Sequence, residues 1–287
     1  MKSNQISLSI VAGLALFVTS CSSSDESTNP TKDAVNPLIE ELVEDESAQE
    51  TSYFLPSALQ IGSVFQKSGL KYSGGVINEP GNVSKYESKT SKLLNFGTYS
   101  ADLAYCILNS QSQVAMNQLT SLKALADGLG MESVFGSDKM FRQFENNMGN
   151  QDSIIDVMIQ IQEKLDMYVD DNDMQSSANI MFAGAWIEGM YIGVKATNEE
   201  KEERITKRLV EQMVILDNLV KAIHSVENAT ADLTTIEDQL KSLKTFFDGL
   251  EEVKSAQGVR DIELSINHLK EIADRIVEMR QSIVDPV

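Results

Sequence analysis

Two acidic residues occur inside segments that are otherwise apolar. Glu188 is the single charged residue of the run "MFAGAWIEGMYIGV" (181–194), and Asp102 is the single charged residue of "NFGTYSADLAYCIL" (95–108). Burying an unpaired carboxylate in an apolar interior is costly, so each acid is expected to be neutral, hydrogen-bonded or paired with a cation. Arg142 or a nearby lysine is the expected source of positive charge.

Four aromatic residues in the same two segments can donate hydrogen bonds to these acids: Tyr99, Tyr105, Trp186 and Tyr191. Two interpretations remain open. In the structural one, the acids form a polar clasp that fixes how two helices meet. In the functional one, Asp102 and Glu188 form the floor of a pocket with an aromatic wall, which binds a metal or a cationic or hydroxylated ligand.

Both histidines of the chain occur in the spacing His-x-x-Glu, as His224 with Glu227 and His268 with Glu271. Residues three apart share a helix face, so each pair could offer one nitrogen and one oxygen to a metal. The di-metal motif of helical bundles runs in the opposite order, Glu-x-x-His, and needs further inward glutamates. "AIHSVE" also resembles the Gly-x-His-x-x-Glu signature of imelysin-type iron-uptake lipoproteins, with Ala222 in place of the glycine.

Other catalytic signatures are missing from the sequence. There is no nucleophile-elbow serine, no phosphate-binding glycine loop and no cysteine pair at metal-ligand spacing. We therefore expect no enzyme and no cofactor. A metal-uptake protein or enzyme that uses Asp102 and Glu188, or the His-x-x-Glu pairs, is the alternative.

The elements that must position these residues are expected to be helices. Prolines are few, and alternating β-branched runs are missing. The two acid-bearing segments predict central helices, and small residues at intervals of four (Ala185, Gly189 and Gly193) form a strip where another helix can approach. We expect that partner to be the helix over 95–108.

The C-terminal third has a different pattern. Apolar residues at three–four spacing predict three long helices, from about 209 to 223, 233 to 250 and 262 to 283. They are typical of an antiparallel coiled-coil-like bundle. Its charged runs, such as "NEEKEERITKR" (198–208), read as solvated faces. The fold class is thus all-α, a multi-helix bundle, with a central domain over 53–197 and a long-helix bundle over 198–287.

The N-terminus is typical of an exported protein. A basic start and a short apolar stretch precede "VTSC", which resembles the lipobox of bacterial lipoproteins. The resemblance implies a signal peptide over 1–20, cleavage before Cys21, and diacylglycerol and an acyl chain on Cys21. Residues 21–52 are polar and acidic and read as a flexible tether.

The patterns "NFG.Y.ADL.Y" and "AG.WIEG.YI" resemble an uncharacterised family of all-helical lipoproteins from Gram-negative bacteria. That resemblance implies a fold and a location. "SSSDE" after Cys21 is similar to a tag for surface display, so we expect a lipid anchor in the outer membrane, facing the periplasm or, slightly favoured, the cell surface.

Composition constrains the partners. The formal net charge is −19, and such a surface repels nucleic-acid backbones. The expected partners are the membrane, through the lipid anchor, and a protein of the cell envelope, with a small ligand as a further possibility.

Overall fold

The computed structural model describes residues 57–67, 69–136, 139–195 and 202–285, and this part of the chain is all-α, as predicted. Its longer helices are α2 (Ala58–Lys67), α3 (Lys89–Leu108), α4 (Ser112–Leu129), α6 (Lys139–Asn146), α7 (Gln151–Asp171), α8 (Gln175–Lys195), α9 (Glu202–Met213), α10 (Leu216–His224), α11 (Ala231–Gly249) and α13 (Ile266–Val284). Short elements are α5 (Glu132–Phe135), α12 (Glu251–Lys254) and the 3₁₀ helices η1 (Pro80–Lys85) and η3 (Val259–Asp261).

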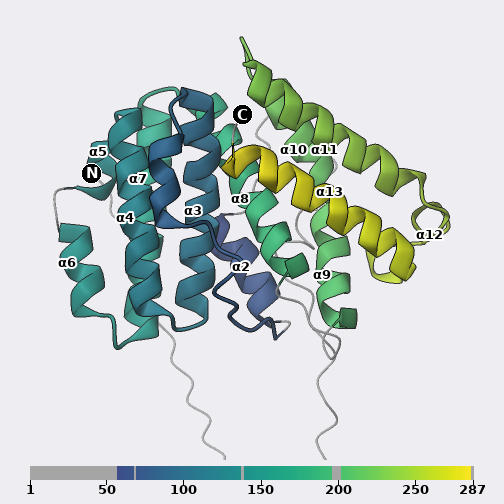
Figure 1. Ribbon diagram of the computed structural model, residues 1–287, viewed down its shortest axis with the longest axis horizontal. Helices are drawn as coiled ribbons and strands as arrows, with labels where there is room; N and C mark the ends of the chain where they lie inside the picture. The colour runs from purple at the N-terminus through teal and green to yellow at the C-terminus, as the bar shows by residue number, and fades with distance from the viewer. Residues whose placement is uncertain (1–56, 68, 137–138, 196–201, 286–287) are drawn as a thin grey trace, which may run out of the picture.

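Helix α8 is the centre of the molecule. It lies between a group formed by α3, α4 and α7 and a second group formed by α10, α11 and α13, while α2 packs beside it (Figure 1). Residues on every side of α8 are buried, from Ile180 to Gly193, which agrees with its unbroken apolar sequence. Its most extensive contact is with α3, the predicted partner.

Two glycines set the distance between α3 and α8. A Cβ atom on Gly97 would lie 1.8 Å from the carbonyl oxygen of Met181, and one on Gly184 would lie 1.9 Å from that of Leu94. The two backbones are therefore in direct contact, and only residues without a side chain fit there.

The predicted strip of small residues serves two neighbours instead of one. Ala185 faces Gly97 of α3, but a Cβ on Gly189 would lie 2.5 Å from Ile61, and one on Gly193 would lie 2.7 Å from Phe65. Ile61 and Phe65 belong to α2. The C-terminal part of the strip, Gly189 and Gly193, thus makes room for α2. This second neighbour was not predicted.

Polar side chains cap two of these helices. Helix α3 starts at Lys89, because the preceding residues form η1 and the Ser88 hydroxyl accepts a hydrogen bond from the Ser91 amide at 3.0 Å. Helix α7 is capped by Asn150, which accepts from the Ser153 amide at 3.2 Å.

The C-terminal third departs most from expectation. The first predicted long helix is interrupted at Val214 and Ile215, which separate α9 from α10, and the last begins at Ile266, so Ile262 lies outside it. The predicted coiled-coil-like arrangement is not confirmed: α11 contacts both α10 and α13, but α10 and α13 each also pack on α8. Buried apolar residues on both sides of the segment 196–201 belong to one continuous core.

The signal peptide, Cys21 and the tether lie outside the described residues. Within the described residues, no helix combines the length and the hydropathy needed to cross a bilayer.

Candidate functional site

Asp102 of α3 and Glu188 of α8 lie together in the core. Both side chains are 0 % exposed, and their carboxyl groups are close enough for each to affect the pKa of the other. The predicted burial of both acids is confirmed. Two carboxyl groups in direct contact cannot both be ionised at low cost, so one of them holds a proton.

The cation of the site is Arg280 of α13. Its Nε atom donates to Glu188 Oε2 at 3.0 Å and its second guanidinium nitrogen reaches Oε1 at 3.4 Å. The guanidinium also stacks over the ring of Tyr191, with 4.6 Å from Cζ to the ring centroid. Arg142, the predicted cation, is exposed on α6, so that expectation was wrong.

Of the two acids, Asp102 is the one that holds the proton. Its Oδ2 atom accepts from the backbone amide of Asn78 at 2.9 Å, whereas Oδ1 has no donor among the described residues. The pKa of Asp102 is well above its usual range, mainly because the group is buried and secondly because of the nearby charge of Glu188. Burial also raises the pKa of Glu188, but the ion pair with Arg280 opposes this. A protonated Asp102 satisfies its Oδ1 by donating to an ionised Glu188.

Two of the predicted aromatic residues, Tyr99 and Tyr105, bind the backbone of a loop. Tyr99 donates its hydroxyl proton to the carbonyl of Glu79 at 2.7 Å, and Tyr105 donates to the carbonyl of Lys71 at 2.8 Å. Tyr105 also accepts from the Ser73 amide at 2.7 Å, and burial raises its pKa to about 12. These bonds fix the segment 71–79 beside the acids, where Asn78 meets Asp102.

The other two predicted aromatics have different roles. Trp186 is 0 % exposed, and its indole nitrogen has no acceptor among the described residues. Tyr191 serves as the ring beneath Arg280. Neither is hydrogen-bonded to Asp102 or Glu188 in any contact that the structure describes.

A buried polar network that the sequence interpretation missed binds the end of α13. Asn95 donates to the carbonyl of Ile283 at 2.9 Å, and Tyr86 donates to that of Val284 at 3.3 Å. Carbonyls at the end of a helix lack partners within it, so these side chains complete α13. Asn95, buried inside an apolar helix, is the one signal in the sequence that indicated such a network.

The acids do not line any of three hollows that the structure shows. One of these, between Ala101, Tyr105 and Gly189, encloses about 10 Å³, barely enough for one water molecule. A larger groove of about 560 Å³ lies over Gly97 and Ala185, with Phe96, Met181 and Phe182 among its lining. This geometry supports the polar clasp over the ligand pocket.

The His-x-x-Glu pairs do not come together as ligand sets. His224 Nδ1 contacts Glu237 and His268 Nδ1 contacts Glu252, each at 2.8 Å. Glu271 instead accepts from Arg275, and Glu227 is exposed. Within the described ranges, no three His, Cys, Asp or Glu side chains converge as a metal site would require.

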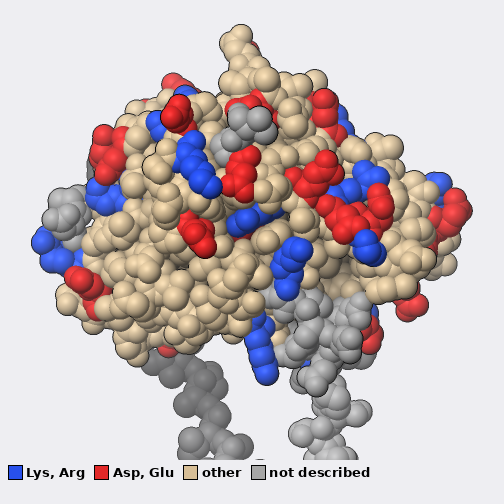
Figure 2. All heavy atoms as spheres, in the orientation of Figure 1, with Lys and Arg blue, Asp and Glu red and all other residues tan. Residues whose placement is uncertain are grey.

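Many surface charges occur as oppositely charged neighbours. Figure 2 shows acidic and basic side chains intermixed over α11 and α13, in keeping with ion pairs such as Lys270–Asp274 and Arg275–Glu271. Exposed pairs of this kind contribute little to stability. The Glu188–Arg280 pair differs because its side chains are 0 % and 12 % exposed.

No protein family, curated protein or solved structure matches this chain.

The proton on Asp102 predicts a specific pH dependence. Asp102 keeps its proton in the folded state at pH values where the unfolded chain, with an aspartate pKa near 4, has released it. The contribution of Asp102 to the free energy of unfolding is therefore complete below pH 4 and declines as the pH rises toward its pKa in the folded state. Asp102→Asn, which mimics the neutral acid, removes this dependence. We expect the unfolding free energy of the parent, relative to Asp102→Asn, to fall with pH by at most about 1.4 kcal/mol per unit.

Urea unfolding of both chains from pH 5 to pH 8 measures this difference. Exposed Asp238→Asn is the control and should show no such trend. A constant difference between the parent and Asp102→Asn would place the proton elsewhere.

Proposed function

We propose that this protein is a lipid-anchored envelope lipoprotein whose folded part is a non-enzymatic binding or structural module. The proposal draws its location from the sequence: the export signal, the lipobox-like "VTSC" and the polar tether. The anchor is expected in the outer membrane, with display on the cell surface slightly favoured. A protein of the envelope, or a small ligand, is the expected partner.

One observation carries the non-enzymatic part of the proposal. Asp102 and Glu188, the most chemically conspicuous residues, are fully buried and satisfied by Arg280, Asn78 and each other. A catalytic acid or base has to reach substrate, and these two do not. Binding is better served by the open hollows at the surface.

The alternative, a metal-uptake protein or an enzyme, gains no comparable support. A cation bound between Asp102 and Glu188 would have to displace the Arg280 guanidinium from a buried ion pair. Each histidine is engaged with a glutamate of another helix.

Mass spectrometry of the chain purified from its native membrane tests the anchor. We expect an N-terminal residue Cys21 that carries diacylglycerol and an acyl chain, and Cys21→Ser should release the protein from the membrane fraction. An unmodified thiol at Cys21 would refute the proposed attachment.

Metal analysis of the same preparation tests the alternative. Stoichiometric iron, zinc or copper that is lost in Asp102→Ala or His224→Ala would contradict a non-enzymatic module without a metal.

A further inference from the structure

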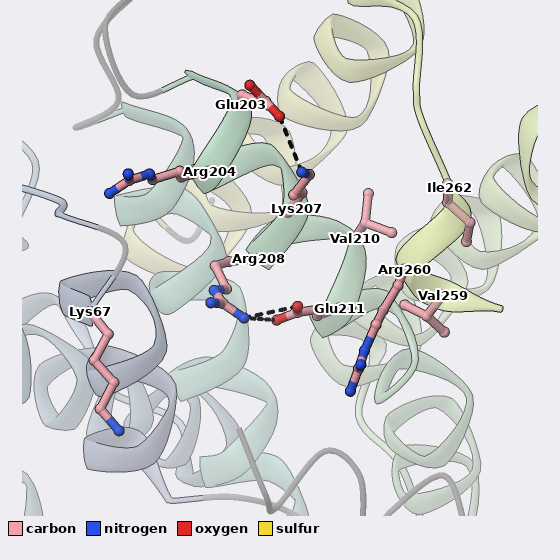
Figure 3. A pocket seen from close by; sticks show the side chains of 10 residues that line it. All are labelled: Lys67, Glu203, Arg204, Lys207, Arg208, Val210, Glu211, Val259, Arg260 and Ile262. Carbon is pink, nitrogen blue, oxygen red and sulfur yellow. Dashed lines mark hydrogen bonds and ion pairs between the residues drawn. The ribbon is translucent and has the colours of Figure 1, made fainter. Parts of the chain in front are cut away.

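A hollow of about 290 Å³ opens between the end of α2, the outer face of α9 and the segment that contains η3 (Figure 3). Its lining comes from three parts of the chain that are distant in sequence: Lys67, Glu203, Arg204, Lys207, Arg208, Val210, Glu211, Val259, Arg260 and Ile262. A hollow of this volume is at the lower end of the range of ligand pockets.

The lining is strongly basic, in contrast with the chain as a whole. Five of these residues are Lys or Arg and two are Glu, whereas the whole chain has 24 basic and 43 acidic residues. Charges more than about 8 Å away are largely screened at physiological salt, so the positive excess of the lining favours an anion here.

Both carboxylates of the lining already have partners on α9. Glu211 accepts two hydrogen bonds from Arg208, at 2.9 and 2.8 Å, and Glu203 pairs with Lys207 at 3.1 Å. Lys67 and Arg204 form no ion pair with any described residue. Figure 3 shows Lys67 and Arg260 on either side of the Arg208–Glu211 pair.

The side of the hollow toward η3 is apolar. Val210 is 2 % exposed, and Val259 and Ile262 are half-buried beside it. A ligand that fits this lining has a compact, multiply charged anionic group and a carbon body. A phosphate monoester carries close to two negative charges at neutral pH and accepts hydrogen bonds from several cations at once, which suits such a lining.

We propose that this hollow binds the phosphate group of an organic phosphate, either a soluble ester or a lipid headgroup. The inference rests on the proposed binding function and specifies the ligand's chemistry. It does not conflict with the exclusion of nucleic acid, because a net charge of −19 repels a long polyanion far more than a single phosphate group.

Calorimetric titration of the full mature chain, in a non-ionic detergent, tests the proposal. The probes are inorganic phosphate, glycerol phosphate and a monomeric short-chain phosphatidic acid, a lipid whose phosphate is also a monoester. We expect saturable binding of glycerol phosphate that weakens as salt increases. Lys67→Gln with Arg204→Gln should weaken it by about 100-fold, since each lost charge-assisted contact contributes about tenfold.

A matched variant controls for net charge. Lys139→Gln with Arg142→Gln removes two exposed cations from α6 and should change affinity by less than about twofold. Should the first double variant fail to fold, Lys67→Gln, an exposed site, is the second test, with about a tenfold loss expected.

The probes also distinguish the two sources of phosphate. Tighter binding of the short-chain lipid than of glycerol phosphate would indicate a headgroup site that uses Val259 and Ile262, whereas equal affinity would indicate a soluble ester. No saturable binding of any probe, or an equal loss in the α6 control, would overturn the proposal. Neither result would affect the lipid anchor, which the mass spectrometry tests separately.

Discussion

Gly97→Ala is expected to destabilise the protein by about 3 kcal/mol, and Gly184→Ala by a similar amount. The added methyl groups would lie 1.8 and 1.9 Å from backbone carbonyl oxygens of the facing helix. Backbone atoms cannot rotate away as a side chain can, so α3 and α8 would have to separate and lose packing along their lengths. A loss of this size is a large part of the stability of a typical domain.

Chemical unfolding monitored by circular dichroism measures the loss. Gly249→Ala is the control, because Gly249 ends α11 and a Cβ there would meet nothing within 4 Å. It should change stability by less than about 1 kcal/mol. Near-parent stability of Gly97→Ala would show that the two helices are not in the contact described.

Arg280→Met is expected to cost about 3 kcal/mol or more at pH 7. The substitution leaves Glu188 buried and charged beside Asp102, with no cation to balance it. Protonating Glu188 relieves that cost, so the loss should shrink as pH is lowered toward 5. Replacing both partners, as Glu188→Leu with Arg280→Met, should recover most of the stability, because it leaves no unpaired charge.

Arg275→Met is a closely matched control on the same helix. Arg275 also pairs with a glutamate, Glu271 at 2.8 Å, and also stacks on a ring, Phe246 at 4.7 Å. Its side chain is 31 % exposed, against 12 % for Arg280. We expect a cost below about 1 kcal/mol. Equal losses at the two positions would mean that burial does not govern the Glu188–Arg280 pair.

The sequence predicted the α-helices of the central region well because their signals are local. Unbroken apolar composition and small residues at intervals of four are features of single segments, so 95–108 and 181–194 could be predicted as helices, and they lie within α3 and α8. The same reasoning failed at Val214 and Ile215. The three–four spacing continues through them, yet the helix breaks there. Both α9 and α10 contact α8, but α9 also contacts α2 and η3, whereas α10 contacts α11.

The two acids of the buried site could be predicted from the sequence, but their partners could not. An acid inside an apolar helix has to be compensated, which is why Asp102 and Glu188 could be singled out together. Their partners could not, since Arg280 is 92 residues beyond Glu188 and lies on an amphipathic helix beside ordinary surface charges. Asn78 takes part through its backbone amide, for which no side-chain pattern exists.

The basic hollow was hidden for a similar reason. The run "NEEKEERITKR" reads as a solvated helix face when it is taken alone. Only the fold brings Lys67 and Arg260 to the same place as Arg204. Tertiary proximity, and not the composition of any one segment, creates the positive excess.

The late position of Arg280 has a consequence for biogenesis. Until α13 has been synthesised, a nascent chain contains the two core acids without the guanidinium that balances them. Fragments that stop short of residue 280 are therefore expected to be less stable and more readily degraded by proteases than the complete chain.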